Sequence, residues 1–509
     1  MDKKNAKNLI LLFVLTLLTK GLGFLKTSIT AASFGMSIET DIYNLADGVM
    51  NQVFYAFTIS IALIIVPLYL EKVAESPLAG KRFAKSAYLS IWGFGGALFA
   101  LVAVLAPLLA RLMGREYAQE HIQLLTKYMW ILSVGMVLSL VANALQSILN
   151  AASIYGYPSI CAMINSAVII GFILLFADTL GIWAMVFAVP VAFLIQTVIL
   201  NVRAAPLMKV SLRKEKFDPS IKKLYTQMVP VFMSNASMEL NGFVDKYILA
   251  GLNAGAVTAI SYANVLLVFA TNIITIPVTT ILFTDVSTLC AQKKYDQVRT
   301  VTETTIVKIL MLCLPVVGIT VLCSRDIVNS VFGYGLFGAE AVSMTAKALM
   351  VYGLSIVFYV LKDVINRVCY ALQETKIPMV ASIVGAVVHI AVALLLVKAF
   401  DMVAVAVGTV IGVAFMAFYT YLRLSKKYLH TSLKPYAGSF GKIAIALIAM
   451  LAVVVLLANV PLNFAVASQI LSIGRFVGCT AVGFIVYFGL LLAMKETYIT
   501  EIIGSFLKR

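Results

Sequence analysis

Long apolar segments recur along this chain and dominate what it can fold into. A helix needs about 20 mostly apolar residues to cross the hydrocarbon core of a bilayer, and fourteen segments of the 509-residue sequence meet that need. Only 12% of the residues are charged, against about 25% in soluble proteins. The sequence therefore predicts an all-α polytopic membrane protein with about 14 transmembrane helices. The predicted spans are residues 8–34, 41–70, 87–113, 121–152, 158–178, 181–203, 224–251, 256–288, 301–324, 341–372, 378–398, 402–424, 438–460 and 469–494.

The positive charge of the chain is concentrated in the loops between these segments. With the N-terminus inside, the inner segments hold 25 Lys and Arg residues and the outer segments hold 4. Such an excess marks cytoplasmic loops, so we expect both termini in the cytoplasm. The same distribution explains the net charge of +16 without nucleic acid, which is not expected as a partner. The first apolar run is too long for the apolar core of a cleavable signal peptide.

The sequence contains a weak internal repeat. An offset of 219 residues pairs Gly23 with Gly242, and an offset of 220 pairs Pro158 with Pro378. Six spans per copy leave both copies starting on the same side, so the repeat predicts two parallel six-helix lobes around a central cleft, with substrate bound between them. The predicted division is an N-terminal lobe (1–205), a basic cytoplasmic linker (206–223), a C-terminal lobe (224–425) and an additional two-helix segment (436–495).

Several ionisable residues lie within the predicted spans. A charge at bilayer depth costs about 2.5–3.5 kcal/mol by insertion scales, and it usually faces a cavity or a partner and serves a function. The repeat places Lys26 and Asp245 at equivalent positions, so they are expected to face each other across the cleft. These groups could bind an anionic headgroup in a water-filled cleft, or they could form structural ion pairs. The deep or semi-deep set is Lys20, Lys26, Asp41, Asp47, Glu239, Asp245, Lys246, Lys362, Asp363, Arg367, His389 and Arg475.

From this set we select Lys20, Lys26, Lys246, Asp41 and Asp245 as candidate substrate-binding residues. Helix-end structure or gating is the expected role of three further residues, Arg367, Glu374 and Lys376. His389 and Arg475 are interpreted as structural.

The sequence lacks the motifs of a catalytic or cofactor-binding protein. The six cysteines are scattered through apolar runs without metal-ligand or redox spacing. A phosphate-binding P-loop and a nucleophile elbow are also missing from the sequence. We therefore expect a non-enzymatic transporter without a metal or cofactor, driven by an ion gradient or a membrane potential.

Four runs of the sequence form a recognisable set: Thr19-Lys20-Gly21-Leu22-Gly23-Phe24-Leu25-Lys26, Thr40-Asp41-Ile42-Tyr43, Ser261-Tyr262-Ala263-Asn264, and the segment from Arg367 to Pro378. They resemble the MurJ/MviN-type lipid II flippase family, and the first run resembles the opening of that family. The resemblance places this chain in the multidrug/oligosaccharidyl-lipid/polysaccharide exporter superfamily. It implies that a lipid-linked glycan precursor of peptidoglycan is flipped across the bacterial cytoplasmic membrane by alternating access. It also implies that Lys20 and Lys26 stand where the family has phosphate-binding arginines, with Asp41 and Asp245 at two further family positions.

The chain departs from the family pattern in its charged residues. Both first-span arginines are lysine, which lacks the bidentate geometry that suits phosphate. The family's Asp-Arg in the eighth span is Asn264-Val265, and paired arginines of the second span are replaced by Asn51-Gln52-Val53. Lys246 is the expected substitute for this lost charge. The alternatives are a flippase for another lipid-linked oligosaccharide, a cation-coupled multidrug antiporter and a non-transporting scaffold. Expected partners are the lipid-linked glycan, membrane lipids and a coupling ion of unknown identity.

Overall fold

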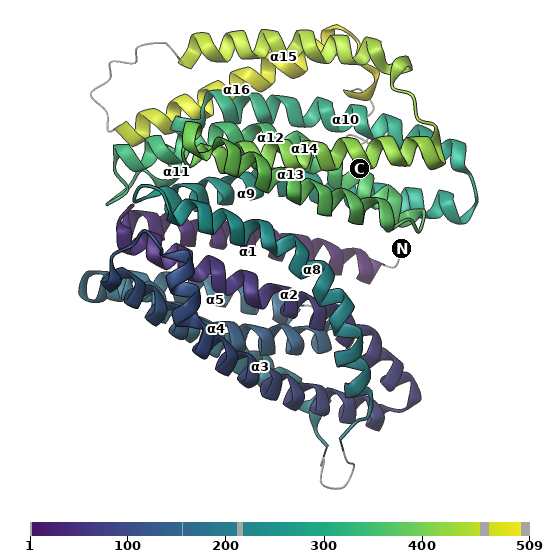
Figure 1. The fold of residues 1–509 in the computed structure, drawn as a ribbon. Helices are drawn as coiled ribbons and strands as arrows, with labels where there is room; N and C mark the ends of the chain where they lie inside the picture. The colour runs from purple at the N-terminus through teal and green to yellow at the C-terminus, as the bar shows by residue number, and fades with distance from the viewer. Residues whose placement is uncertain (1–2, 155, 211–216, 459–467, 500–509) are drawn as a thin grey trace. The chain divides into compact units, whose positions relative to one another are not determined.

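The computed structural model describes residues 3–154, 156–210, 217–458 and 468–499, and all the regular secondary structure in them is helical (Figure 1). The predicted linker residues 211–216, the loop 459–467 and the ends of the chain lie outside the described residues. The long helices are α1 (Lys3–Phe34), α2 (Ile38–Glu75), α3 (Pro77–Met113), α4 (Gln119–Ala151), α5 (Gly156–Leu180), α6 (Trp183–Ala204), α8 (Ser220–Ala250), α9 (Ala256–Ala291), α10 (Tyr295–Leu322), α12 (Ala339–Ala371), α13 (Lys376–Phe400), α14 (Val403–Leu424), α15 (Ala437–Ala458) and α16 (Ser468–Ala493).

These helices confirm the all-α membrane fold expected from the apolar segments. Within the described residues, twelve helices are long and apolar enough to cross a membrane. The remaining two predicted spans correspond to α1 and α8, which are helices of 32 and 31 residues. The apolar pattern did not predict the nine-residue helix α11 (Ser324–Phe332), which is too short to span a bilayer.

Serine side chains and a left-handed glycine define the ends of the second helix. Gly35, with φ +60°, follows α1 and ends it in a conformation that L side chains rarely adopt. Ser37 then caps α2 by accepting a hydrogen bond from the Thr40 backbone N–H at 3.2 Å. Ser76 caps α3 in the same way through Ala79, at 3.1 Å, and Pro77 occupies the first turn. The turns between these helices are therefore encoded locally.

The helices group into two compact units. The first unit comprises Met1–Thr258 with Gly335–Phe337. In it α4 packs against α2, α3 and α6, α5 packs against α1 and α6, and α8 lies along α2 and α3. Buried side chains of α2, α3 and α4, among them Ile65, Phe83 and Leu145, form its apolar core. Packing thus groups α8 with the preceding helices. The predicted lobe boundary at 206–223 was drawn from the sequence repeat, and it stays a prediction.

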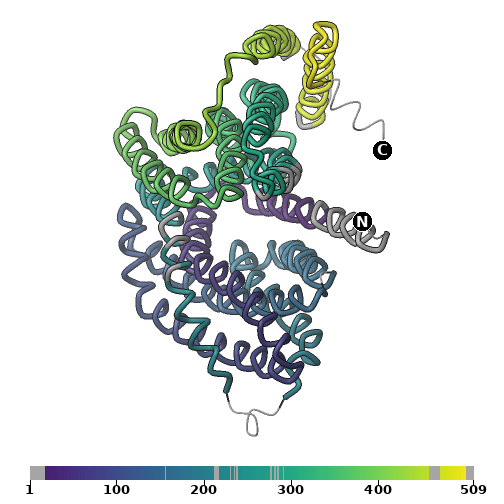
Figure 2. The backbone as a smooth tube through the Cα atoms, turned by 90° about the vertical axis from the view of Figure 1, so that its right-hand side faces the viewer, coloured from purple at the N-terminus to yellow at the C-terminus, as the bar shows by residue number. Residues whose placement is uncertain are grey.

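The second unit comprises Ala259–Tyr334 and Gly338–Arg509. Here α12 packs against α10 and α14, and α13 packs against α14. Helices α15 and α16 lie beside each other (Figure 2) and contact α10, and α16 also contacts α11. Their shared core with α10 contains Met311, Met450 and Tyr487, and the Tyr487 hydroxyl donates a hydrogen bond to the Met311 carbonyl at 3.0 Å. The additional two helices are thus attached to the second unit through α10 and α11.

The internal repeat is visible in the helices themselves. Helices α4, α5 and α6 have 33, 25 and 22 residues, and α12, α13 and α14 have the same three lengths. Each helix of the second set begins and ends 220 positions after its counterpart. The same offset relates three pairs of positions with positive φ, namely Gly35 and Gly255, Ser153 and Gln373, and Gly181 and Asp401. The repeat therefore extends to individual backbone conformations in the turns.

Candidate functional site

Three helices of the first unit bring two lysines to one carboxylate. Lys26 on α1, Asp47 on α2 and Lys246 on α8 are all half-buried. Asp47 interacts electrostatically with both lysines. Ionisable groups in membrane helices are costly unless they are paired or reach water. Here the two ammonium groups share Asp47, and Lys246 also interacts with Asp41 and Asp245. The cluster of Lys26, Asp47 and Lys246 keeps a formal charge of +1.

Glycines allow the long polar side chains of this cluster to fit between α2 and α8. A Cβ atom on Gly48 would lie 2.5 Å from Lys246 Cε and 3.1 Å from its Nζ. One helical turn away the roles are exchanged, because the Gln52 amide lies against Gly242 of α8. Each helix thus offers a glycine to a polar side chain of the other, a use of small residues that is common between membrane helices. The Lys246 ammonium is thereby held close to the backbone of α2.

The predicted site residue Asp41 has a different environment. Its side chain is only 1% exposed and accepts hydrogen bonds from the backbone N–H groups of Gly255 at 2.5 Å and Thr258 at 2.9 Å. The Thr258 hydroxyl donates a third bond to the same carboxylate at 2.5 Å. Gly255 has φ +93°, a left-handed conformation that points its N–H toward α2. Asp41 therefore fastens the start of α2 to the turn between α8 and α9, and its role in substrate binding stays a prediction.

The remaining predicted binding residues lie on the helices of the cluster. Lys20 is exposed on α1, about one and a half turns before Lys26. Asp245 is half-buried on α8 and interacts electrostatically with Lys246. Lys26 was expected to face Asp245, and the structure identifies an electrostatic interaction of Lys26 with Asp47. Asp47 was among the deep charges of the sequence, but selecting it required knowing which lysines α1 and α8 bring to α2.

The predicted helix-end residues lie in the second unit. The Arg367 guanidinium is 5.7 Å from the centre of the Phe283 ring. The Glu374 side chain is 7% exposed and accepts hydrogen bonds from Lys427 Nζ at 2.6 Å, the Tyr428 hydroxyl at 2.6 Å and the Lys376 backbone N–H at 3.0 Å. These donors, Lys427 first, lower the pKa of Glu374 to about 2. The contacts tie the turn before α13 to the end of α14.

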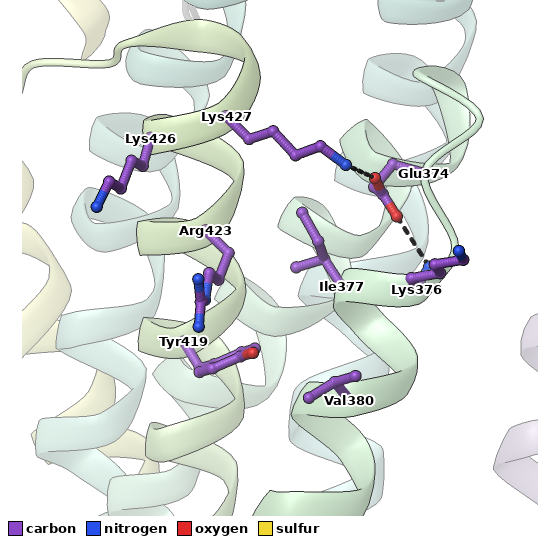
Figure 3. A pocket seen from close by; sticks show the side chains of 8 residues that line it. All are labelled: Glu374, Lys376, Ile377, Val380, Tyr419, Arg423, Lys426 and Lys427. Atoms are coloured by element: carbon purple, nitrogen blue, oxygen red, sulfur yellow. Dashed lines mark hydrogen bonds and ion pairs between the residues drawn. The ribbon is translucent and has the colours of Figure 1, made fainter.

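A basic pocket of about 450 Å³ opens beside this turn (Figure 3). Lys427 extends across it toward Glu374, and Arg423 and Tyr419 line it from α14. Among the described residues, His, Cys, Asp and Glu side chains form no group of three or more that could hold a metal ion. Two features of the described residues therefore carry functional chemistry, namely the charged cluster of α1, α2 and α8 and this basic pocket.

Solved structures with the same fold are membrane transporters. One titled "Lipid II flippase MurJ, inward closed conformation" superposes with a TM-score of 0.77 at 21% identity, covering 95% of this chain and 100% of that chain. An inward-facing multidrug resistance MATE family transporter of the MOP superfamily superposes with a TM-score of 0.64 at 17% identity, covering 79% of this chain and 98% of that one. These likenesses establish the fold, which this chain shares with a flippase and with a drug exporter.

Sequence relatives narrow this comparison. A probable lipid II flippase MurJ of Rickettsia prowazekii is 22% identical over 502 residues, covering 96% of this chain and 97% of that protein. The lipid II flippase MurJ of Burkholderia cenocepacia is 23% identical over 393 residues, covering 72% of this chain and 73% of that protein. The family model of the lipid II flippase MurJ matches residues 30–473. The chain belongs to the MurJ lipid II flippase family.

Proposed function

We propose that this protein is a flippase that translocates lipid II, the undecaprenyl-pyrophosphate-linked precursor of peptidoglycan, across the bacterial cytoplasmic membrane. Membership of the MurJ family supports the reaction. The observation that carries the residue assignment is the charged cluster, in which Lys26 and Lys246 both interact with the carboxylate of Asp47 inside membrane helices. Two half-buried ammonium groups that share Asp47 suit a ligand whose negative charges can replace this shared counter-ion.

In the proposed mechanism the pyrophosphate replaces Asp47 as the counter-ion of the lysines. Lys20 and Lys26 on α1 and Lys246 on α8 bind the phosphates, while Asp41 and Asp245 orient the site. A lysine ammonium acts as a compact point charge and shifts partners more readily than a bidentate arginine. Alternating access by the two repeat-related lobes then carries the sugar across while the prenyl chain stays in lipid. A coupling ion or the membrane potential supplies the driving force.

The proposed topology places both termini and the basic linker in the cytoplasm. It is supported by the excess of Lys and Arg in the inner loops. Arg367, Glu374 and Lys376 then lie toward the cytoplasmic end of the second unit, where they stabilise helix ends or take part in gating.

The test is a flipping assay with the full-length protein in liposomes that contain fluorescent lipid II. We expect Lys20→Gln/Lys26→Gln to abolish flipping and to fail to support growth of a flippase-depleted bacterium at unchanged protein level. The matched control is Lys347→Gln/Lys398→Gln, which removes two exposed lysines elsewhere and should keep full activity. Wild-type rates in the Lys20/Lys26 variant would refute the assignment of the site.

A second cargo has a specific observation in its favour. The arginines typical of the family are lysine at positions 20 and 26, and the eighth span has Asn264-Val265 in place of Asp-Arg. A different undecaprenyl-linked oligosaccharide would be bound by different side chains at these positions. Faster flipping of an O-antigen or teichoic-type precursor than of lipid II in the same liposomes would reassign the cargo and keep the mechanism.

A further inference from the structure

The basic pocket of the second unit lies between the start of α13 and the end of α14. Lys376, Arg423, Lys426 and Lys427 line it together with one acidic residue, Glu374. Ile377 and Val380 of α13 form an apolar wall that continues down the helix from the charged rim (Figure 3). The pocket thus combines four cations with a single carboxylate and an apolar side.

The carboxylate of this pocket is fully engaged. Glu374 accepts its three hydrogen bonds from Lys427, Tyr428 and the Lys376 backbone. The side chains of Lys376, Arg423 and Lys426 have no carboxylate within 4.0 Å among the residues that the structure describes. The Arg423 guanidinium lies 5.3 Å from the centre of the Tyr419 ring, so a cation–π contact restrains it while its N–H groups stay available. Three cations are therefore free to bind an anion.

The equivalent place in the first unit shows that the fold does not require such a pocket. At the 220-residue offset, Glu374 corresponds to Ile154 and Lys427 corresponds to Leu207, and both of these apolar residues pack on the core of the first unit. Lys376 and Lys426 correspond to Gly156 and Pro206. Lys426 and Lys427 also lie in a π-helical segment, Ser425–Leu429, where the first unit has a 3-10 helix, Ala205–Met208. The basic pocket thus differs from its counterpart in side-chain chemistry and in the local backbone after α14.

One arginine is common to both places but is used differently. Arg203, the counterpart of Arg423, lies over the Tyr157 ring at 4.7 Å from its centre. Tyr157 lies on α5 and corresponds to Ile377 on α13. In the first unit, Arg203 therefore contacts an aromatic ring of the neighbouring helix, at the place where the second unit has its pocket. Arg203 therefore offers a matched control, since it has the same charge at the equivalent helix end.

We propose that the pocket of the second unit binds a phosphate-bearing anionic group, with the phosphate on Lys376, Arg423 and Lys426. Basic pockets between membrane helices on the cytoplasmic side bind the headgroups of anionic phospholipids, and the apolar wall of Ile377 and Val380 suits an acyl chain below such a headgroup. A soluble phosphate is the other source of the same chemistry. The proposal does not rest on the proposed flippase activity, because none of these residues belongs to the cluster of α1, α2 and α8.

The test measures binding to the full-length protein in a neutral detergent by calorimetry. The probes are dioctanoyl phosphatidylglycerol, zwitterionic dioctanoyl phosphatidylcholine and inorganic phosphate. We expect saturable binding of phosphatidylglycerol, weakened roughly 10- to 30-fold in Arg423→Gln/Lys426→Gln, since each cation near a membrane surface contributes about 1 kcal/mol. Lys376→Gln, on the other helix, should weaken binding about fivefold, and Arg203→Gln should leave it unchanged.

The arms of the experiment separate the sources of the anion. Phosphatidylglycerol binding well above inorganic phosphate identifies a lipid site, whereas equal binding of phosphate with the same sensitivity to substitution identifies a soluble-anion site. All three variants leave Glu374 and its hydrogen bonds in place, and their thermal unfolding should match that of the wild type. Binding of neither anionic probe, or equal binding by the wild type and Arg423→Gln/Lys426→Gln, would overturn the proposal.

Discussion

The two repeated halves of this chain share the helix lengths of α4–α6 and α12–α14 and place their charges differently. In the first half, charge lies within the helices, as Lys26 and Asp47 do on α1 and α2. At the offset of 219 residues Asp47 corresponds to Leu266, which is 7% exposed in the apolar interior of the second unit. The second half also gathers charge at its helix ends, around Glu374. The repeat thus preserves the lengths and turns of α4–α6 in α12–α14, while the sites depend on a few substitutions.

The burial of the charged partners also differs between the two places. In the cluster of α1, α2 and α8 the lysines themselves are half-buried. At the pocket the carboxylate of Glu374 is 7% exposed while the side chain of Lys427 is 59% exposed. A half-buried ammonium group depends strongly on its counter-ion, whereas an exposed one is screened by water and salt. Removing a carboxylate should therefore matter more in the first half.

The largest expected effect is that of Asp47→Asn. It leaves the two half-buried lysines without their shared counter-ion, and we expect the free energy of unfolding to fall by about 2–3 kcal/mol and flipping to be lost. Thermal unfolding in detergent and the liposome assay measure the two effects. Asp47→Asn/Lys26→Gln should cost less than the sum of the single changes, because the residues interact. Strict additivity would show that Asp47 and Lys26 do not form one cluster.

Asp41→Asn should have the next largest effect. Gly255 donates to one carboxylate oxygen of Asp41 and Thr258 donates to the other, but an asparagine side chain has only one oxygen that can accept. Hydrogen bonds to a charged group contribute about 1.5–3 kcal/mol. We expect a loss of about 2–3 kcal/mol in the free energy of unfolding. Thr258→Val removes only the hydroxyl donor and should cost about 1 kcal/mol. If Asp41→Asn unfolds like the wild type but does not flip lipid II, then Asp41 acts on substrate and does not anchor α2.

The apolar pattern was sufficient to predict the fold, because membrane helices must satisfy their backbone hydrogen bonds internally and must reach a set length. The span predicted at 378–398, for example, is observed as α13, Lys376–Phe400. Helix α11 escaped prediction because it has nine residues and carries Arg325 and Asp326. Its place between α10 and α12 depends on tertiary packing.

The candidate sites were less accessible to sequence reasoning because their partners are distant in the chain. Asp47 interacts with Lys246, about 200 positions later, through the packing of α2 against α8. Glu374 meets Lys427 across 53 positions. The ionisable residues of the spans were identifiable from their cost in a membrane, but their pairing follows from helix packing that a single sequence does not reveal.

A smaller and pH-dependent effect is expected at Glu374. Its pKa is lowered from 4.5 to about 2 by the bonds from Lys427 and Tyr428, so the folded state favours the ionised form. The resulting stabilisation is complete above pH 4.5 and is lost as the pH falls toward 2. Glu374→Gln should lower the unfolding temperature at pH 7 and weaken its fall between pH 5 and pH 3. An unchanged pH profile in Glu374→Gln would place the acid sensitivity elsewhere.

The smallest effect is expected at a turn that occurs in both halves, with glycine in one and aspartate in the other. It tests how much the aspartate side chain costs in a backbone conformation that favours glycine. Gly181 ends the turn after α5 with φ +57°, and its counterpart Asp401 after α13 has φ +51° with ψ −139°. Both N–H groups donate to the carbonyl four residues earlier at 2.9 Å, so the two turns differ chiefly in the presence of a side chain. A non-glycine residue held in such a conformation costs about 1–3 kcal/mol.

Exchanging the residue types should therefore shift stability in opposite directions. Asp401→Gly relieves the strain but adds conformational freedom to the unfolded chain, which offsets about 0.5–1 kcal/mol, so we expect a net gain of about 1 kcal/mol. Gly181→Ala should cost a similar amount through backbone strain alone, because an added Cβ would have no atom within 4 Å outside its neighbours. Thermal unfolding of both variants measures the pair. A loss of stability in Asp401→Gly would mean that the Asp401 side chain contributes a stabilising contact that outweighs the strain of its backbone.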